Sequence, residues 1–445
     1  MFRAFGVLFI AILLVVPITG DAQFLSPEER TRLEAEYQQL QKEIAEWQKV
    51  LDETRAKKNT IQGDVTALTA QIKQAEAQIK QKNLAISKLS TEIKAKTARI
   101  GELSIHMEQS LESLASLLRQ KNEMDNTSLV TLALGADDFT AFFVEADAII
   151  KLQGLLQQNI DELRGVKAET EQERAALAEK QDAEIDARYV VETKKQQVAK
   201  SETEKKSLLA ITKNQESEYQ KVLAERERRA EAIRTALFDL RDSAGIPFGT
   251  ALDYATFAGE KTGVRTAVIL AILSQESDLG KNVGSCYVTD LSTGAGVGKN
   301  TGKVFPNTMK APRDTVPFER ITRALGLTWA TTPVSCAAGG GYGGAMGPSQ
   351  FIPSTWELFA SRLKTSLGVS EPNPWDAKHA IMATATYLKD LGAAGQTYTS
   401  ERNAACRYYS GRACDTKRPT NYTYGNSVMT KAAKFQEDID FLKGV

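Results

Sequence analysis

This sequence has no net charge, only two histidines and few long apolar runs. The 56 basic and 56 acidic residues cancel over 445 positions, so the charge gives no reason to expect nucleic acid as a partner. The two histidines are His106 and His379, and no Cys-x-x-Cys motif occurs. We therefore expect no metal and no cofactor, with a zinc site on the cysteines as the less favoured alternative.

The one long apolar run lies at the N-terminus. Residues 1–22 combine a basic Arg3, an apolar segment over Ala4–Val16 and a small-x-small triplet that ends at Ala22. This pattern is typical of a secretory signal peptide. The apolar segment is shorter than the ~20 residues that a membrane-spanning helix needs, so cleavage is favoured over retention as an anchor. We expect an exported protein, in the periplasm or at the cell surface, without a membrane span after signal cleavage.

All four cysteines lie in the C-terminal part of the chain, and an exported chain can form disulfides. Four cysteines allow three pairings. We favour Cys286 with Cys336 and Cys406 with Cys414, and the second pair would close a short loop.

Two long charged segments show helical spacing of their apolar residues. From Leu33 to Leu117 this spacing alternates between four and three, which is the heptad pattern of a coiled coil. A continuous helix of about 85 residues would be ~130 Å long at about 1.5 Å per residue. Leu152–Leu237 follows with a less regular pattern. Joined by a short apolar segment, the two predict an antiparallel coiled-coil hairpin over residues 23–242.

The apolar segment between these helices, around residues 125–150, contains the pattern LxxLxLGADDFxxFF. We call its aromatic residues the tip phenylalanines; they are Phe139, Phe142 and Phe143. The pattern resembles the equivalent region of the coiled-coil domains in EnvC- and PcsB-type peptidoglycan hydrolase regulators. That resemblance implies docking on the extracytoplasmic part of an FtsEX-type membrane complex. The alternative is that the tip phenylalanines only cap the core of the hairpin itself.

A Gly- and Pro-containing stretch, Asp242–Pro247, marks the expected domain boundary. Residues 243–445 suffice for one globular core, and strand signals in them are few. The expected helices are Gly249–Lys261, Thr262–Gly280, a segment within Pro317–Leu325, Ser354–Ser366, Ala377–Leu391 and Ser400–Tyr409. The predicted fold class is all-α dominated, with a long antiparallel coiled-coil hairpin followed by an α-rich globular domain.

A candidate catalytic carboxylate lies in the expected helix Thr262–Gly280. The apolar stripe of this helix consists of Val268, Ile269, Ile272 and Leu273. Glu276 follows three and four residues after the last two, so it continues the same face. Burial there would raise the pKa of this carboxyl toward neutrality, as a general acid requires. The alternative is a surface Glu in the last turn, or a buried one satisfied by backbone.

A second motif follows downstream in Gly339–Trp356, GGGYGGAMGPSQFIPSTW. Its glycines allow close approach of the backbone to another surface, and Ser354 is a reasonable N-cap for the next helix. A Glu-Ser pair at a helix end followed by GAMGxxQFxPSTW resembles the lytic murein transglycosylases, in particular their MltB-type branch. The later segments Asn373–Ala393 and Tyr424–Val428 also resemble that branch. The resemblance covers roughly residues 245–440.

The resemblance implies a lysozyme-like domain that cleaves the bond between MurNAc and GlcNAc in peptidoglycan. In that family one Glu, here Glu276, protonates the glycosidic oxygen and then acts as base for the C6 hydroxyl, which closes a 1,6-anhydro ring. The residues that would bind the saccharide are Ser277, Tyr342, Gly344, Ala345, Met346, Gln350, Phe351, Tyr408 and Tyr424.

The sequence departs from the family at one position near this site. The family's Tyr-Asn-x-Ser stands here as Tyr408-Tyr409-Ser410-Gly411, so Tyr409 replaces the polar Asn. The details of saccharide binding are therefore open. Two other functions compete with the transglycosylase: a hydrolytic muramidase on the same fold, and a catalytically inactive regulator whose coiled coil binds a partner.

Overall fold

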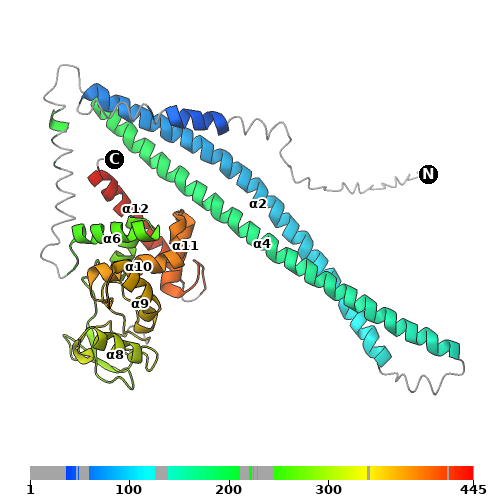
Figure 1. Cartoon of the computed structure of the whole chain (residues 1–445). Coiled ribbons are helices and arrows are strands. Elements are labelled where there is room, and N and C mark those ends of the chain that lie inside the picture. The colour runs from blue at the N-terminus through cyan, green and yellow to red at the C-terminus, as the bar shows by residue number, and fades with distance from the viewer. Residues whose placement is uncertain are drawn as a thin grey trace, which may run out of the picture. The chain divides into compact units, whose positions relative to one another are not determined.

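Most of the chain that the computed structural model describes is helical (Figure 1). The described residues are 37–46, 49, 60–125, 139–210, 220–222, 224, 228, 245–337, 341–417 and 420–443. They fall into two units: residues 37–46, 49 and 70–198 belong to one, and residues 60–69 and those from 199 onward belong to the other. The predicted signal peptide lies outside the described residues. Within them, no helix combines the length and the apolar character that crossing a membrane requires.

Two long helices, α2 (Ile61–Asp125) and α4 (Phe139–Ala210), run in opposite directions and confirm the predicted antiparallel hairpin (Figure 1). Ion pairs join them, and as the residue number rises on α2 it falls on α4. The pairs are Glu92–Lys180 (2.8 Å), Lys96–Glu173 (2.8 Å) and Arg99–Glu169 (2.7 Å), and a hydrogen bond joins His106 to Glu162 (2.8 Å). Such solvent-accessible pairs contribute only about 0–1 kcal/mol each, so buried apolar residues provide most of the stabilisation. These buried residues include Ile72, Ala75, Leu103, Leu152, Leu156, Val166 and Val191.

The heptad pattern from Leu33 to Leu117 does not fold as one continuous helix, since Thr60 lies outside any helix. Helix α2 begins at Ile61, where the Thr60 hydroxyl accepts a hydrogen bond from the Gly63 N–H at 3.0 Å. This side-chain bond caps a helix N-terminus, so the heptad pattern runs past the end of a helix. The side chains of the tip phenylalanines and all of residues 126–138 lie outside the described residues.

The second unit contains the α-rich globular part. Its helices are α6 (Phe248–Thr262), α7 (Thr266–Ser277), α8 (Thr315–Ala324), η3 (Trp329–Thr331), α9 (Pro353–Leu367), α10 (Ala377–Asp390), η4 (Ala393–Gly395), α11 (Tyr398–Ser410) and α12 (Tyr422–Lys443). Between α7 and α8 lies a small antiparallel sheet in the order β1 (Cys286–Val288), β2 (Gly296–Gly298) and β3 (Val304–Phe305). Helices α6, α10 and α12 pack around α7, which forms the centre of the core.

Helix α7 is shorter than predicted and more deeply buried. The preceding helix ends at Thr262 because Gly263 adopts a left-handed φ of 79°, and α7 ends at Ser277 because Asp278 does the same at 50°. All seven residues from Ala267 to Leu273 are buried. The expected single apolar stripe is therefore wrong, since a helix that is apolar all round is a core helix.

Both ends of α7 are fixed by side chains from elsewhere. At its start, the Arg265 Nε donates to the buried Glu401 of α11 at 2.6 Å. At its end, the Ser277 hydroxyl lies 2.6 Å from the Pro348 carbonyl oxygen. Removal of Arg265 would leave the buried Glu401 carboxylate without this partner, and loss of one partner of a buried ion pair typically costs about 3–5 kcal/mol.

Two other expectations need correction. The N-cap of α9 is Ile352 and not Ser354, because Pro353 occupies the first helical position, where its missing N–H costs nothing. The Ser354 hydroxyl instead donates to the buried Asp314 at 2.5 Å. Helix α12 was not expected at all, since its first turn contains Gly425, a poor helix former. Packing against α7 provides what the local sequence lacks.

Candidate functional site

Glu276 lies in the last turn of α7, and its side chain meets the first turn of α12. The Tyr424 hydroxyl donates a short hydrogen bond to Oε1 of Glu276. The neighbouring Gln275 accepts from the Ser427 hydroxyl at 2.9 Å and from the Lys431 ammonium at 2.6 Å. Tyr424, Ser427 and Lys431 are spaced by three and four residues, so one face of α12 aligns the end of α7.

Burial dominates the electrostatics of Glu276. Loss of solvation raises the pKa of this carboxyl above its ordinary value of 4.5, although the hydrogen bond from Tyr424 opposes the shift. Burial and the nearby carboxylate raise the pKa of Tyr424 and of Tyr408 well above 10.0. The site thus combines a carboxyl that holds its proton more tightly than usual with two tyrosines that stay protonated. The pKa shift has the direction that the sequence predicts.

Asp278 is the carboxylate closest to Glu276 in sequence, but it belongs to the surface. Its side chain is exposed and forms an ion pair with Lys281 at 3.0 Å. The left-handed conformation at Asp278 ends α7 and separates this side chain from the helical face of Glu276.

Ser277, a predicted saccharide-binding residue, is buried and bonded to the protein itself. Besides its contact with the Pro348 carbonyl, its hydroxyl accepts from the Gly280 N–H at 2.8 Å. These bonds connect the end of α7 with the segment that contains Gln350. The structure therefore gives Ser277 the geometry of a positioning residue for Glu276 rather than of a ligand contact.

The segment around Gly344 is held close to its neighbours. Gly344 has a left-handed φ of 87°, and a Cβ there would lie 3.1 Å from the Met309 side chain. Its N–H donates to the Ser335 carbonyl at 2.9 Å, and the Ala345 N–H donates to the Ser335 hydroxyl at 2.9 Å. The left-handed conformation favours glycine at position 344, and the Met309 side chain leaves little room for a Cβ. This segment is fixed before any ligand binds.

The side chains of Met346 and Phe351 belong to the core. Met346 is 1% exposed and Phe351 is 4% exposed, and their backbones pair across a tight turn with an N–H to carbonyl distance of 2.9 Å. The Phe351 ring contacts the Tyr408 ring at 5.8 Å between centroids. Both residues, predicted to line the cleft, are therefore core residues.

Gln350 and Tyr342 are more accessible. Gln350 is half-buried with a left-handed φ of 52°, and its Nε2 donates to the Gly347 carbonyl at 2.7 Å. Tyr342 is exposed, and the centroid of its ring lies 5.8 Å from the Lys310 Nζ. No hydrogen bond within the described chain connects Tyr342 with Glu276.

Tyr408 connects α11 with the Gln350 segment and α10. Its hydroxyl donates to the Ser349 carbonyl at 2.8 Å. The Ser349 hydroxyl accepts from Thr384 at 2.7 Å and donates to the Ala380 carbonyl at 2.8 Å. This chain of bonds fixes the Tyr408 ring next to Glu276.

The cysteines pair as the sequence favours. Cys286 is joined to Cys336 and Cys406 to Cys414, with S–S distances of 2.05 Å and 2.02 Å. No thiol among these four remains for zinc. In the described part of the chain, no group of three or more His, Cys, Asp or Glu side chains could hold a metal ion.

The second disulfide supports the start of α12. A Cβ on Gly425 would collide with the Cys406 sulfur and lie 2.9 Å from the Cys414 sulfur. Only glycine therefore lets the chain pass the disulfide at this point, directly after Tyr424. The ring of Tyr409 stacks on the Tyr424 ring with centroids 4.8 Å apart and planes at 14°. Sequence reasoning noted Tyr409 only as a departure from a motif, because nothing local to it indicates the partner.

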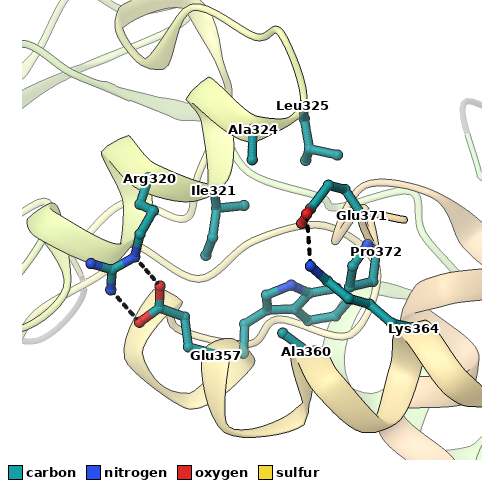
Figure 2. A pocket seen from close by; sticks show the side chains of 10 residues that line it. Arg320, Ile321, Ala324, Leu325, Glu357, Ala360, Lys364, Glu371 and Pro372 are labelled. Carbon is teal, nitrogen blue, oxygen red and sulfur yellow. Dashed lines mark hydrogen bonds and ion pairs between the residues drawn. The ribbon is translucent and has the colours of Figure 1, made fainter. Parts of the chain in front are cut away.

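A pocket of about 300 Å³ lies away from these residues, between α8 and α9 (Figure 2). Two ion pairs flank it, Arg320–Glu357 at 2.6 Å and Lys364–Glu371 at 2.7 Å. Its lining residues are Arg320, Ile321, Ala324, Leu325, Trp356, Glu357, Ala360, Lys364, Glu371 and Pro372. None of them is a predicted site residue, so this pocket is not the site around Glu276.

Comparison with protein families gives one match. The profile described as "Transglycosylase SLT domain" matches residues 172–430. No curated protein matches the chain, and no solved structure does either. The match begins inside α4, so the boundary expected at residue 243 stays a prediction. It includes Glu276, both disulfides and the tyrosines around the carboxyl. Since it spans more than half of the 445 residues, the chain belongs to the transglycosylase SLT domain family, whose function is lytic cleavage of peptidoglycan.

Proposed function

We propose that the protein is a lytic transglycosylase that cleaves the β-1,4 bond between MurNAc and GlcNAc and leaves 1,6-anhydro-MurNAc ends. The observation that carries the proposal is the environment of Glu276. Its carboxyl is buried enough to have a raised pKa, and the Tyr424 hydroxyl can stabilise its charged form. A group that must first donate and then accept a proton needs both properties.

The proposed reaction uses one carboxyl twice. Glu276 first donates its proton to the glycosidic oxygen as the bond from that oxygen to C1 of MurNAc breaks. The resulting carboxylate then takes the proton of the MurNAc C6 hydroxyl, whose oxygen forms the new bond to C1. No water enters, and Glu276 ends protonated as it began.

Tyr424 has a supporting role in this scheme. Its hydroxyl keeps its proton because its pKa is well above 10.0, so it can donate to Glu276 Oε1 in both half-steps. This hydrogen bond strengthens when the carboxylate is charged, which is the state between the two proton transfers. Ser277 and Tyr408 would hold the carboxyl and the facing wall in place, and Gly344, Ala345 and Gln350 would approach the glycan.

A one-carboxyl mechanism also explains the surroundings of Glu276. Glycoside hydrolysis generally uses a second carboxylate, as base or nucleophile. Asp278 is exposed and paired with Lys281, and it lies outside the helical face of Glu276. An internal hydroxyl nucleophile removes the need for that second group.

The test is digestion of purified peptidoglycan by the full chain, with mass spectrometry of the products. We expect anhydro-sugar ends, which are lighter by one water than reducing ends. Reducing ends alone would favour the hydrolytic muramidase. No cleavage by the wild type, under conditions where a known lytic enzyme works, would favour the inactive regulator.

We also propose that the protein acts outside the cytoplasm, in cell wall remodelling or division, and that the coiled-coil hairpin is its regulatory arm. The expected signal peptide and the peptidoglycan substrate of the family support export. The arm would extend over residues 23–242 and the enzyme over residues 243–445. The tip phenylalanines would bind an FtsEX-type membrane complex. If a protein with substituted tip phenylalanines still bound that complex in a pull-down, the proposed role of the arm would be contradicted.

A further inference from the structure

Tyr409 carries an aromatic ring that extends the site of Glu276 toward solvent. It lies in the last turn of α11 and is 53% exposed. Tyr424 covers part of it, with ring planes only 14° apart, and Tyr424 in turn donates to Glu276. A stack of two rings thus leads from the half-buried Glu276 to an accessible aromatic surface.

The backbone next to Tyr409 is held in place by contacts within the protein. Helix α11 ends at Ser410, and the next residue, Gly411, adopts a left-handed φ of 73°. The buried Asn421 then donates to the Ser410 hydroxyl at 2.7 Å and to the Ala413 carbonyl at 2.9 Å. The Cys406–Cys414 disulfide closes the same turn. A fixed backbone at this position reduces the conformational entropy that is lost on binding, which favours a role in recognition.

An aromatic surface of this kind suits one class of ligand. A pyranose ring presents aliphatic C–H groups on its faces and hydroxyl groups around its edge. A flat, uncharged ring can pack against such a face while the sugar hydroxyls stay in water or bond elsewhere.

We propose that Tyr409 is a stacking platform for an N-acetylhexosamine ring of the glycan, in a binding subsite next to Glu276. This inference rests on the proposed function and specifies its substrate contacts. Where the related family has Asn, this chain exchanges a polar contact for an aromatic surface. The exchange makes the subsite select for the face of the sugar rather than for a single hydroxyl or amide.

Tyr409 could instead serve only to brace Tyr424, and the two roles differ in what they change. A platform contributes to binding of the sugar, so its loss raises Kd and KM. A brace contributes to the placement of Tyr424 and Glu276, so its loss changes kcat and the pH profile. The Tyr409→Phe variant keeps the ring in both roles and serves as the conservative substitution.

The test measures binding of a GlcNAc–MurNAc oligosaccharide to the full chain carrying Glu276→Gln, which cannot cleave it, by calorimetry. Adding Tyr409→Asn should weaken binding about two- to twelvefold, whereas Tyr409→Phe should stay within about twofold. Tyr422→Asn is the matched control. Tyr422 is exposed to a similar degree, but the Arg402 guanidinium covers its ring at 4.6 Å.

In the cleaving protein, Tyr409→Asn should raise KM by a similar factor and leave the pH profile of kcat unchanged. Equal Kd values with and without Tyr409→Asn would overturn the inference, as would a shifted pH profile with unchanged Kd. If the Asn variant does not fold, NMR of the oligosaccharide bound to the Glu276→Gln chain decides. Sugar C–H signals should move upfield above the aromatic ring, and unmoved signals would refute the stacking.

These results are separable from the proposed function. A wild type that cleaves peptidoglycan while Tyr409→Asn binds the oligosaccharide as well as before would reject only the platform. A wild type that neither binds nor cleaves glycan would reject the proposed function itself.

Discussion

Replacing Glu276 with glutamine changes one proton-carrying group and little else in the site. The amide has almost the same shape as the carboxyl, and its oxygen can still accept the Tyr424 hydrogen bond. What it lacks is a proton to give to the glycosidic oxygen and a charge with which to take one back. The substitution therefore separates the chemistry of Glu276 from its packing at the end of α7.

The expected loss of activity follows from these two steps. A positioned general acid or base typically contributes about 10²–10⁴-fold, which corresponds to about 2.7–5.5 kcal/mol of barrier. Because Glu276 would serve in both half-steps, we expect a loss at or above the upper end of this range. The assay is the rate of release of soluble fragments from purified peptidoglycan by equal amounts of the full-length proteins.

The same variant should alter how stability depends on pH. The folded state holds the Glu276 proton more tightly than the unfolded chain does, since burial raises the pKa above 4.5. Wild-type stability is therefore lost as pH rises from 4.5 through the folded pKa, and below 4.5 both states are protonated and no penalty exists. Glutamine carries no such penalty. The Tm of Glu276→Gln relative to the wild type should increase as pH rises toward neutrality.

Two results would refute this reasoning. A folded Glu276→Gln protein, judged by circular dichroism and Tm, that keeps more than about a tenth of the activity would remove Glu276 from the mechanism. A Tm difference that does not vary with pH would show that the carboxyl is not desolvated in solution. Asp278→Asn is the matched control, because Asp278 is exposed and its replacement still tolerates the left-handed conformation. It should keep nearly full activity.

The remaining predictions concern Tyr424, the second disulfide and the tip. Tyr424→Phe removes the hydrogen bond that lowers the pKa of Glu276, so the alkaline limb of the kcat/KM profile should move to higher pH and kcat should fall; an unchanged profile would contradict the contact. Converting Cys406 and Cys414 to alanine should lower Tm by several degrees, because a disulfide typically contributes about 2–4 kcal/mol, and four free thiols in protein from its native compartment would contradict the pairing. Changing all tip phenylalanines to serine should abolish binding to an FtsEX-type complex and spare glycan cleavage. Loss of helix signal in circular dichroism would instead assign them to the hairpin core.

The sequence predicted a helix correctly where the apolar spacing and the capping residue indicate the same span. Helix α10 matches its expected span to one residue at its end, because Asp376 caps it and the apolar residues repeat within it. Helix α12 was missed because Gly425 weakens its first turn, and only packing against α7 and the disulfide explains its presence. The start of α7 was placed at Thr262 rather than Thr266, because the sequence did not reveal that the left-handed Gly263 ends the preceding helix.

The candidate site also has one feature that the sequence predicts and others that only the folded chain reveals. The raised pKa of Glu276 could be predicted from its spacing after Leu273, since helix periodicity is a local property. Its bond to Tyr424 spans 148 residues and depends on how α12 packs, so no local pattern could indicate it. The burial of Met346 and Phe351 likewise follows from a tight turn and a cluster of rings, which only the folded chain assembles.

The complete burial of the middle of helix α7 has a consequence for amide hydrogen exchange. Amides that open only when the whole core opens exchange at the rate set by global unfolding. Because Ala267–Leu273 are buried on every side, the amides of this segment should be among the slowest to exchange in the globular part. The carboxyl of Glu276 is thus attached to an element without low-energy local openings. Any conformational signal that reaches the site must act on the residues facing Glu276, on α12 or on the segment around Gln350, and leave α7 itself in place.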